Sequence, residues 1–173
     1  MSVDIKVRGA EKLRLMAKQL READRVDLLR GMQKAIKAAA KPTLAAVQES
    51  ARDISTKGIR KPGARHPFSG PTAPKGTRAK IAGAVVADVR LTGDEPRVRF
   101  RVAASRLPTN IRALPRKFDD GGTFRHPVMG NRDVWVSQTG DPWFWPPIRD
   151  HIKDFRAELD KAIDETRAKL EAG

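Results

Sequence analysis

The sequence contains neither cysteine nor tyrosine. Without cysteine, disulfide scaffolds, thiolate zinc sites and cysteine nucleophiles are excluded, and a reducing, intracellular place of synthesis fits the chain. Long apolar runs are missing as well, because none approaches the ~20 residues that a membrane-spanning helix needs. The N-terminal residues MSVDIKVRG are too charged and too poor in apolar residues for a signal peptide. We therefore expect a soluble protein with no membrane partner.

Acidic residues are scarce relative to basic ones. The chain has 21 Asp and Glu against 35 Lys and Arg, which gives a formal net charge of +14. Half of this excess lies in residues 56–80, which include seven basic residues and no acid. Such a charge favours polyanions or acidic protein surfaces as partners, and does not by itself choose between them. The 173 residues predict a single domain, 1–173, that buries ~70% of the surface of its unfolded chain.

Apolar residues at spacings of three and four predict helices in the first third of the chain. The first helix is expected from about Ala10 to Arg21. A longer amphipathic helix follows Asp24, which is suited to the N-cap, and continues to Ile54. Pro42 lies inside this helix, and its missing N–H and bulky ring predict a kink or a break near Ala38.

The last part of the chain carries the clearest helical pattern. Pro146 and Pro147 suit the start of a helix. The apolar residues that follow are spaced by three or four over residues 148–171, which predicts a C-terminal amphipathic helix. Acidic and basic residues nearly cancel in this helix, so the positive charge of the protein does not come from it.

Strands are predicted where apolar and polar residues alternate. Residues 3–7 alternate in this way, as do two runs between 84 and 102 that are separated by turn residues and predict a β-hairpin. A further strand is expected at 134–137. The fold class is therefore expected to be α+β, with a small antiparallel sheet packed with a long, proline-kinked N-terminal helix and the C-terminal amphipathic helix.

Two features could bind a polyanion or an acidic protein surface. Residues 56–76 contain four prolines and four glycines, which predicts a long basic loop that could serve as a binding arm. The predicted hairpin also presents a row of arginines about 6.6 Å apart on one face, although a solvated outer face is the better explanation of this row. The candidate contact residues are Lys57, Arg60, Lys61, Arg65 and Lys75 in the loop and Arg97, Arg99 and Arg101 in the row.

No pattern of catalytic residues is recognisable, so we expect no enzyme, no cofactor and no metal. His66 and His126 both precede proline, which disfavours the helical geometry of a paired-histidine metal site. Nucleophile elbows, P-loops and dinucleotide-binding glycine motifs are absent. The aspartates between 119 and 141 lie beside turn residues, where such side chains commonly accept hydrogen bonds from backbone N–H groups.

Residues 121–147, GGTFRHPVMGNRDVWVSQTGDPWFWPP, hold all three tryptophans and two of the six phenylalanines. Together with the order of elements along the chain, RHPVMGNRDVWVSQ (residues 125–138) and PWFWPPI (residues 142–148) resemble the tail-completion proteins of long-tailed bacteriophages, the family typified by gene product ten of a lambdoid phage. The resemblance covers nearly the whole chain, and these two motifs are its most specific part.

The resemblance implies a non-enzymatic structural virion protein at the head-to-tail junction. It implies a ring, hexameric by analogy with tail tubes, which joins connector and tail proteins around the DNA passage. The expected partners are further copies of the chain and the neighbouring connector and tail proteins, with transient contact to genomic DNA. The protein would be made in the host cytoplasm and would lie in the neck of the virion.

The aromatic residues of 121–147 are the candidate anchors of these contacts, because large rings bury much area at a low cost in conformational entropy. We expect residues 121–147 to fold back over the sheet, with Trp135 in the core. Since neighbours along an extended segment point to opposite sides, the Trp143–Trp145 triplet should divide between core and interface. The candidate interface residues are Phe124, Trp143, Phe144 and Trp145.

Two other functions remain open. A sequence-nonspecific nucleic-acid-binding protein would explain the sequence pI of about 10.7 and the basic loop. Against it, no helix-turn-helix, zinc finger or RNA-binding aromatic motif is recognisable, and the basic loop contains only one aromatic residue, Phe68. The remaining possibility is an α+β domain with a basic surface and neither binding nor assembly.

Overall fold

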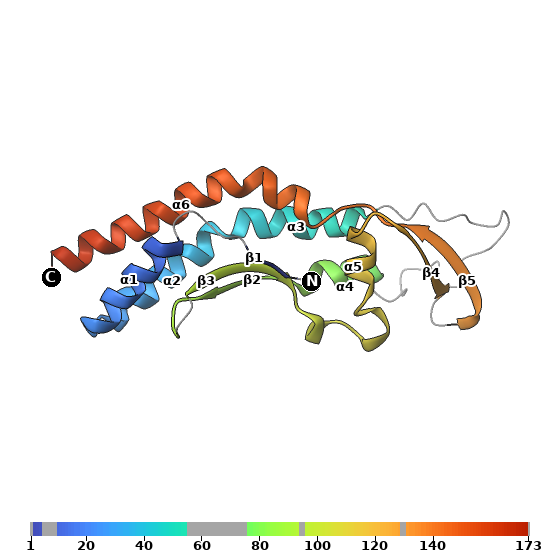
Figure 1. The fold of residues 1–173 in the computed structure, drawn as a ribbon, viewed down its shortest axis with the longest axis horizontal. Coiled ribbons are helices and arrows are strands. Elements are labelled where there is room, and N and C mark those ends of the chain that lie inside the picture. The colour runs from blue at the N-terminus through green and yellow to red at the C-terminus, as the bar shows by residue number, and fades with distance from the viewer. Residues whose placement is uncertain (1, 5–9, 55–75, 94–95, 129–130, 173) are drawn as a thin grey trace. The chain divides into compact units, whose positions relative to one another are not determined.

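The computed structural model describes residues 2–4, 10–54, 76–93, 96–128 and 131–172. The fold is α+β, which confirms the predicted class (Figure 1). The elements follow one another as β1 (Ser2–Asp4), α1 (Ala10–Glu22), α2 (Val26–Ala39), α3 (Lys41–Asp53), α4 (Thr77–Ala84), β2 (Val85–Arg90), β3 (Arg97–Val102), the 3-10 helices Ala104–Arg106 and Thr109–Ile111, α5 (Leu114–Asp119), β4 (Thr123–Val128), β5 (Asn131–Thr139) and α6 (Trp145–Glu171).

The chain forms two compact units that alternate along the sequence. The helical unit comprises residues 2–46, 86–101 and 148–173, and the hairpin unit comprises residues 47–85 and 102–147, together with Met1. The helical unit contains α1, α2, nearly all of α6 and a three-stranded sheet. The hairpin unit contains α4, α5 and the two-stranded sheet of β4 and β5. Whether the whole chain acts as one domain stays a prediction.

The first helix has the expected bounds and buries the expected face, with Leu13, Met16, Ala17 and Leu20 at most 3% exposed. Asp24, however, does not cap α2, whose N-cap is Arg25 without a side-chain cap. Asp24 instead ends α1 in the left-handed region, at φ 53°. Its N–H bonds to the carbonyl of Arg21, while the N–H of Arg25 bonds to that of Leu20. These two bonds form a Schellman motif, which satisfies the last carbonyls of the helix.

The long second helix is divided at Ala40, two residues after the predicted position. Ala40 keeps a helical conformation and its N–H still bonds to the carbonyl of Ile36. Pro42 is the second residue of α3, where a helix does not need the N–H that proline lacks. The prediction of a break caused by Pro42 is therefore confirmed.

The sheet of the helical unit has the strand order β1-β3-β2. β1 runs antiparallel to β3, with Val3 opposite Phe100. Along β3, the buried residues Val98, Phe100 and Val102 alternate with half-buried arginines, as the sequence predicts. The ring of Phe100 meets that of Phe155 on α6 edge to face, at a centroid distance of 5.8 Å. This aromatic contact joins the central strand to the C-terminal helix.

Helix α6 confirms the predicted C-terminal helix and lies alongside α2 (Figure 1). Its pattern of three and four residues places Ile148, Phe155, Leu159 and Ile163 in the core, each at most 2% exposed. The side chain of Thr166 is also buried and donates to the carbonyl of Ala162 at 2.7 Å, so its hydroxyl is satisfied within the helix.

The hairpin unit contains a sheet that was not predicted in full. Only residues 134–137 were expected to form a strand, whereas β4 and β5 form an antiparallel hairpin from Thr123–Thr139 to Val128–Asn131. Pro127 interrupts the pattern of β4, and the register shifts between Pro127 and Val128. Proline is tolerated in a strand at such an irregularity because no ladder hydrogen bond is lost there. The strand expected at 134–137 is therefore confirmed within β5, and β4 is a strand that was not predicted.

A glycine allows the base of this hairpin to pass close to α5. The N–H of Gly140 bonds to the carbonyl of Gly122 at 2.9 Å. A Cβ atom on Gly140 would lie 2.5 Å from the carbonyl oxygen of Phe118, well inside contact distance. The approach of the hairpin to α5 therefore requires glycine at this position.

Candidate interaction sites

Trp143 lies in the core of the hairpin unit, with 2% of its surface exposed. Its indole N–H donates to the carbonyl of Pro115 at 3.1 Å, and its own carbonyl accepts from the Ser50 hydroxyl at 2.8 Å. The ring of Phe144, which is fully buried, meets it edge to face at 5.4 Å. Trp143 therefore joins α3, α5 and the start of α6 and cannot serve as a surface anchor in this conformation.

Asp119, at the end of α5, fixes the backbone of this segment. Its Oδ1 atom accepts from the N–H of Trp143 at 3.0 Å and from the N–H of Phe144 at 2.8 Å. Because the second of these groups immediately precedes α6, the carboxylate satisfies a donor that the helix leaves unpaired. The expectation that an aspartate of 119–141 caps backbone N–H groups is thus confirmed for Asp119.

Two tryptophans of the aromatic segment remain at the surface. Trp145 is 45% exposed and Trp135 is 47% exposed. The triplet therefore divides between core and surface, as expected. The alternation of neighbours is not borne out, however, because the adjacent Trp143 and Phe144 both lie in the core and only Trp145 lies outside. Trp135 was expected in the core, and this prediction is wrong. It lies on β5, which belongs to a sheet of only two strands.

Phe124 is half-buried on β4. Its ring meets that of Phe118 edge to face at 5.4 Å, and the Lys117 ammonium lies 5.7 Å from its centroid. Phe124 therefore holds the hairpin against α5, and only part of its ring is available to another molecule.

The arginine row lies on the central strand β3, and all three side chains are half-buried. Arg101 forms an ion pair with Asp88 on β2, at an Nε–Oδ2 distance of 3.9 Å. Arg99 takes part in a further interaction. The Nε atom of Arg97 is buried and has no hydrogen-bond partner among the described residues. The row is therefore partly occupied within the protein and is not a freely solvated face.

The other candidate contact residues, Lys57, Arg60, Lys61, Arg65 and Lys75, lie outside the described residues. The end of the basic stretch is described, and it forms the short helix α4, which was not predicted. Arg78 on α4 donates to the carbonyl of Arg52 at 3.4 Å, so this cation takes part in the hairpin unit.

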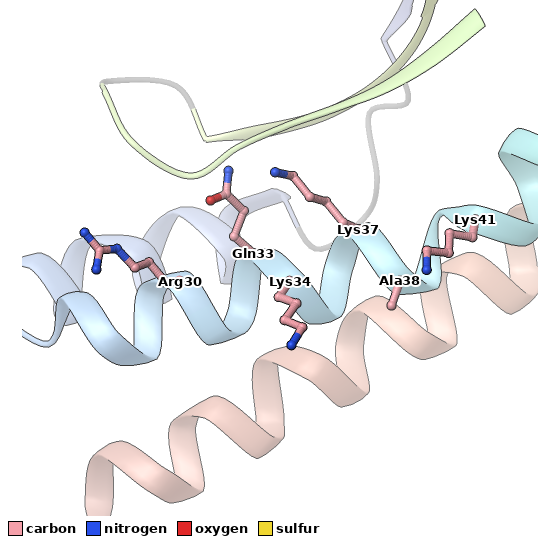
Figure 2. Close-up of a pocket in the computed structure, with 6 residues that line it drawn as sticks. All are labelled: Arg30, Gln33, Lys34, Lys37, Ala38 and Lys41. Atoms are coloured by element: carbon pink, nitrogen blue, oxygen red, sulfur yellow. The ribbon is translucent and has the colours of Figure 1, made fainter. Parts of the chain in front are cut away.

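A basic surface that was not predicted lies along α2 and on Lys41, the first residue of α3. Arg30, Lys34, Lys37 and Lys41 line an open hollow of about 310 Å³, together with Gln33 and Ala38 (Figure 2). We call these four cations the α2 basic stripe. They recur at spacings of four, three and four, which is also the spacing of the buried apolar residues of the helix. The only signal in the sequence that could have identified the stripe is that all four residues are basic.

In the described part of the chain, no group of three or more His, Asp or Glu side chains could hold a metal ion. Asp27 has a lowered pKa, first because the Arg25 side chain donates to it and then because the N–H of Leu28 does. Asp27 is fully exposed at the start of α2, so this shift marks a helix terminus and not a reactive group.

Among the described residues, no helix has both the length and the apolar character needed to cross a membrane. Comparison with models of known protein families, with curated proteins and with solved structures found no match.

Proposed function

We propose that the chain is a non-enzymatic structural subunit of a virion at the head-to-tail junction, where copies of it form a ring that joins connector and tail proteins. The proposal begins from the resemblance of residues 125–138 and 142–148 to phage tail-completion proteins. The first of these segments covers most of the β4–β5 hairpin and the second leads into α6. Both belong to the hairpin unit, except for Ile148.

The observation that carries the proposal is the division of the aromatic residues within this segment. Trp143 and Phe144 hold the segment in a fixed conformation, while Trp135 and Trp145 present large rings to solvent. Half-exposed tryptophans on a rigid support are typical of contact anchors, because little side-chain entropy is lost when a partner covers them. The supporting unit thus orders the contact residues before a partner binds.

The hairpin offers a second type of contact. In the part of the chain that the structure describes, β4 and β5 pair only with each other, so each strand has an outer edge with unused backbone groups. Such edges pair readily with strands of another chain. A neighbouring copy that binds there would satisfy these groups and cover the exposed tryptophans.

The first experiment locates the protein in particles. We expect a labelled chain in purified virions to appear by electron microscopy as a ring at the neck, with a copy number near a multiple of six by quantitative mass spectrometry. Absence of the chain from the particles would reject the proposal.

Substitution of the exposed tryptophans tests the role of the aromatic residues. We expect Trp145→Ala and Trp135→Ala to reduce incorporation into particles by more than their loss of monomer stability explains, because about half of each side chain is buried. The matched control is Leu15→Ala, which removes a 60% exposed apolar side chain from α1 of the helical unit. If the tryptophan variants assemble as well as the control, the rings are not the contact anchors.

The alternative function is sequence-nonspecific nucleic-acid binding without a role in the virion. The observation in its favour is the α2 basic stripe. A chain of this kind would be missing from particles and would bind nucleic acid with an affinity that falls steeply with salt, whereas contacts anchored by aromatic rings depend little on salt.

A further inference from the structure

The α2 basic stripe brings four cations together without an acid beside them. Some basic side chains near helix ends do pair with acids, as in Lys18–Glu22, Arg52–Glu49 and Arg116–Asp120. None of the four stripe residues has an acidic partner within 4.0 Å among the described residues, and all four are exposed. The sequence explains this isolation, because no acid occurs between Asp27 and Glu49.

The stripe has the geometry of a phosphate-contacting surface. Because Ala40 keeps a helical conformation between α2 and α3, the helical rise of 1.5 Å per residue separates Arg30 and Lys41 by about 16 Å. A duplex of that length carries roughly ten phosphates on its two strands, so several face the helix at once. Three of the four cations are lysines, whose flexible stems let each ammonium reach different phosphates without a fixed geometry.

The polar group beside the stripe is not available for reading bases. The Gln33 side chain donates to the carbonyl of Val89 on β2 at 2.9 Å and points toward the strands in Figure 2. Sequence readout commonly uses such an amide or a bidentate arginine in the major groove. The stripe has a single arginine and an amide already in use, which favours contact with the backbone alone.

Aromatic residues are absent from α2, whose sequence is VDLLRGMQKAIKAA. Single-stranded nucleic acid is usually held by rings on which its bases stack, so the stripe suits a duplex better. A small anion is also a poor fit, because the hollow is lined by flexible, exposed side chains. An acidic protein surface would need carboxylates spaced to match, whereas every duplex presents the same array of phosphates.

From this charge, spacing and composition we infer that the α2 basic stripe binds the phosphate backbone of double-stranded DNA without reading its sequence. The contact involves four charges, so it is weak and reversible at physiological salt. A duplex can therefore shift along the stripe by exchanging one phosphate for the next. The inference does not rest on the proposed ring, because the isolated chain should show it.

The test uses the full chain and a fluorescein-labelled duplex of about 30 base pairs of mixed sequence, with binding measured by anisotropy between ~50 and ~200 mM salt. The variant carries Arg30→Gln, Lys34→Gln, Lys37→Gln and Lys41→Gln. The control carries Arg167→Gln, Lys153→Gln, Lys161→Gln and Lys169→Gln on α6, which removes the same number of arginines and lysines from exposed positions. Circular dichroism checks that both remain folded.

Each phosphate that the protein neutralises contributes about 0.9 to the magnitude of the slope of log affinity against log salt. We expect the stripe variant to lower the magnitude of this slope by roughly 3 to 4, and to weaken binding at low salt at least about tenfold. The control should retain most of the slope of the unmodified chain. Measuring the change in slope isolates α2 from the cations of residues 56–76, which are the same in both variants.

Three results would overturn the inference. An unchanged slope in the stripe variant would show that α2 does not contact DNA, and an equal loss in the control would show that only net charge matters. Equal or tighter binding of a single-stranded oligonucleotide or of poly-glutamate, with the same dependence on α2, would assign the stripe to another partner. Failure of ring assembly would leave all of these results unaffected, so the two proposals can be tested separately.

Discussion

At the scale of single residues, Asp119 has an influence that its position at the end of the short helix α5 does not suggest. One carboxylate oxygen holds the N–H groups of Trp143 and Phe144, and thereby fixes the residues that precede α6. Hydrogen bonds to a charged group stabilise a protein by about 1.5 to 3 kcal/mol each. The buried tryptophan and the exposed one that follows it are therefore both positioned by the same side chain.

We expect Asp119→Ala to lower the free energy of unfolding by about 3 kcal/mol, because two backbone donors lose a charged acceptor. Asp119→Asn should cost less, about 1 kcal/mol, since its amide oxygen can still accept. Urea denaturation measures both values.

The control for this prediction is Asp120→Ala. The adjacent Asp120 forms only an exposed ion pair with Arg116, at 3.7 Å, so its loss should cost less than about 1 kcal/mol. If the substitutions at 119 and 120 have equal effects, the carboxylate of Asp119 does not hold the aromatic segment.

At the scale of elements, helix α2 contains a glycine that lowers its stability and that no close packing contact requires. Gly31 is exposed in the interior of the helix, and an added Cβ atom would meet nothing within 4 Å. Gly31→Ala should therefore raise the free energy of unfolding by about 0.8 to 1.0 kcal/mol through helix propensity alone. A denaturant midpoint that stays unchanged or falls would contradict this expectation.

Gly122→Ala provides a comparison outside helices. This glycine is also exposed, and its Cβ position is open. The substitution tests the general effect of removing a glycine from the unfolded chain, which is about 0.4 to 1 kcal/mol where the backbone tolerates it. DNA binding by the Gly31→Ala variant should also be measured. Because this substitution changes no cation, it separates the effect of helix stability on binding from the effect of the charges of α2.

Helices could be predicted from the sequence where the pattern was long and periodic. The faces of α1, α2, α3 and α6 were correct because each buries apolar residues at a spacing that only a helix explains. The break at Ala40 followed from the chemistry of Pro42. The short helices α4 and α5 were not predicted, since six to eight residues give too few turns for a period to appear.

The aromatic segment could be predicted only in part, for physical reasons. β4 contains Pro127, a residue that argues against a strand unless a shift in register accommodates it. The burial of Trp143 depends on Ser50, Pro115 and Asp119, which lie 24 to 93 residues away in the sequence. Trp135 is exposed on β5, in a sheet of only two strands. No local sequence pattern predicts which of these tryptophans is buried. The aromatic content alone, however, did mark residues 121–147 as a candidate interaction segment.

At the scale of the whole molecule, the net charge of +14 opposes compaction, because like charges repel one another. The α2 basic stripe concentrates part of this repulsion where no acid relieves it. The stripe therefore lowers the free energy of unfolding of the unbound chain. Binding of a polyanion to the folded chain raises this free energy again.

The variant in which the four stripe residues are neutralised should therefore bind DNA more weakly and yet be more stable against heat. Neutralising the four stripe residues should raise Tm at low salt, about 20 mM, by roughly 2 to 4 °C for each kcal/mol of repulsion removed. At about 500 mM salt the gain should shrink, because the charges are then screened within a few ångströms. Scanning calorimetry at both salt concentrations measures the difference. A lower Tm for the variant at low salt would mean that the stripe cations make stabilising contacts.

Each of the two units is built from segments that are separate in the sequence, and this arrangement constrains how recombination can alter the gene. The chain passes between the units at residues 46/47, 85/86, 101/102 and 147/148, so any single crossover between homologous genes divides at least one unit between two parents. Neither unit can be exchanged intact by such an event. Mosaic descendants should therefore inherit this gene whole, with recombination joints concentrated outside its reading frame, and a joint found inside it should mark a pair of parents already alike in sequence.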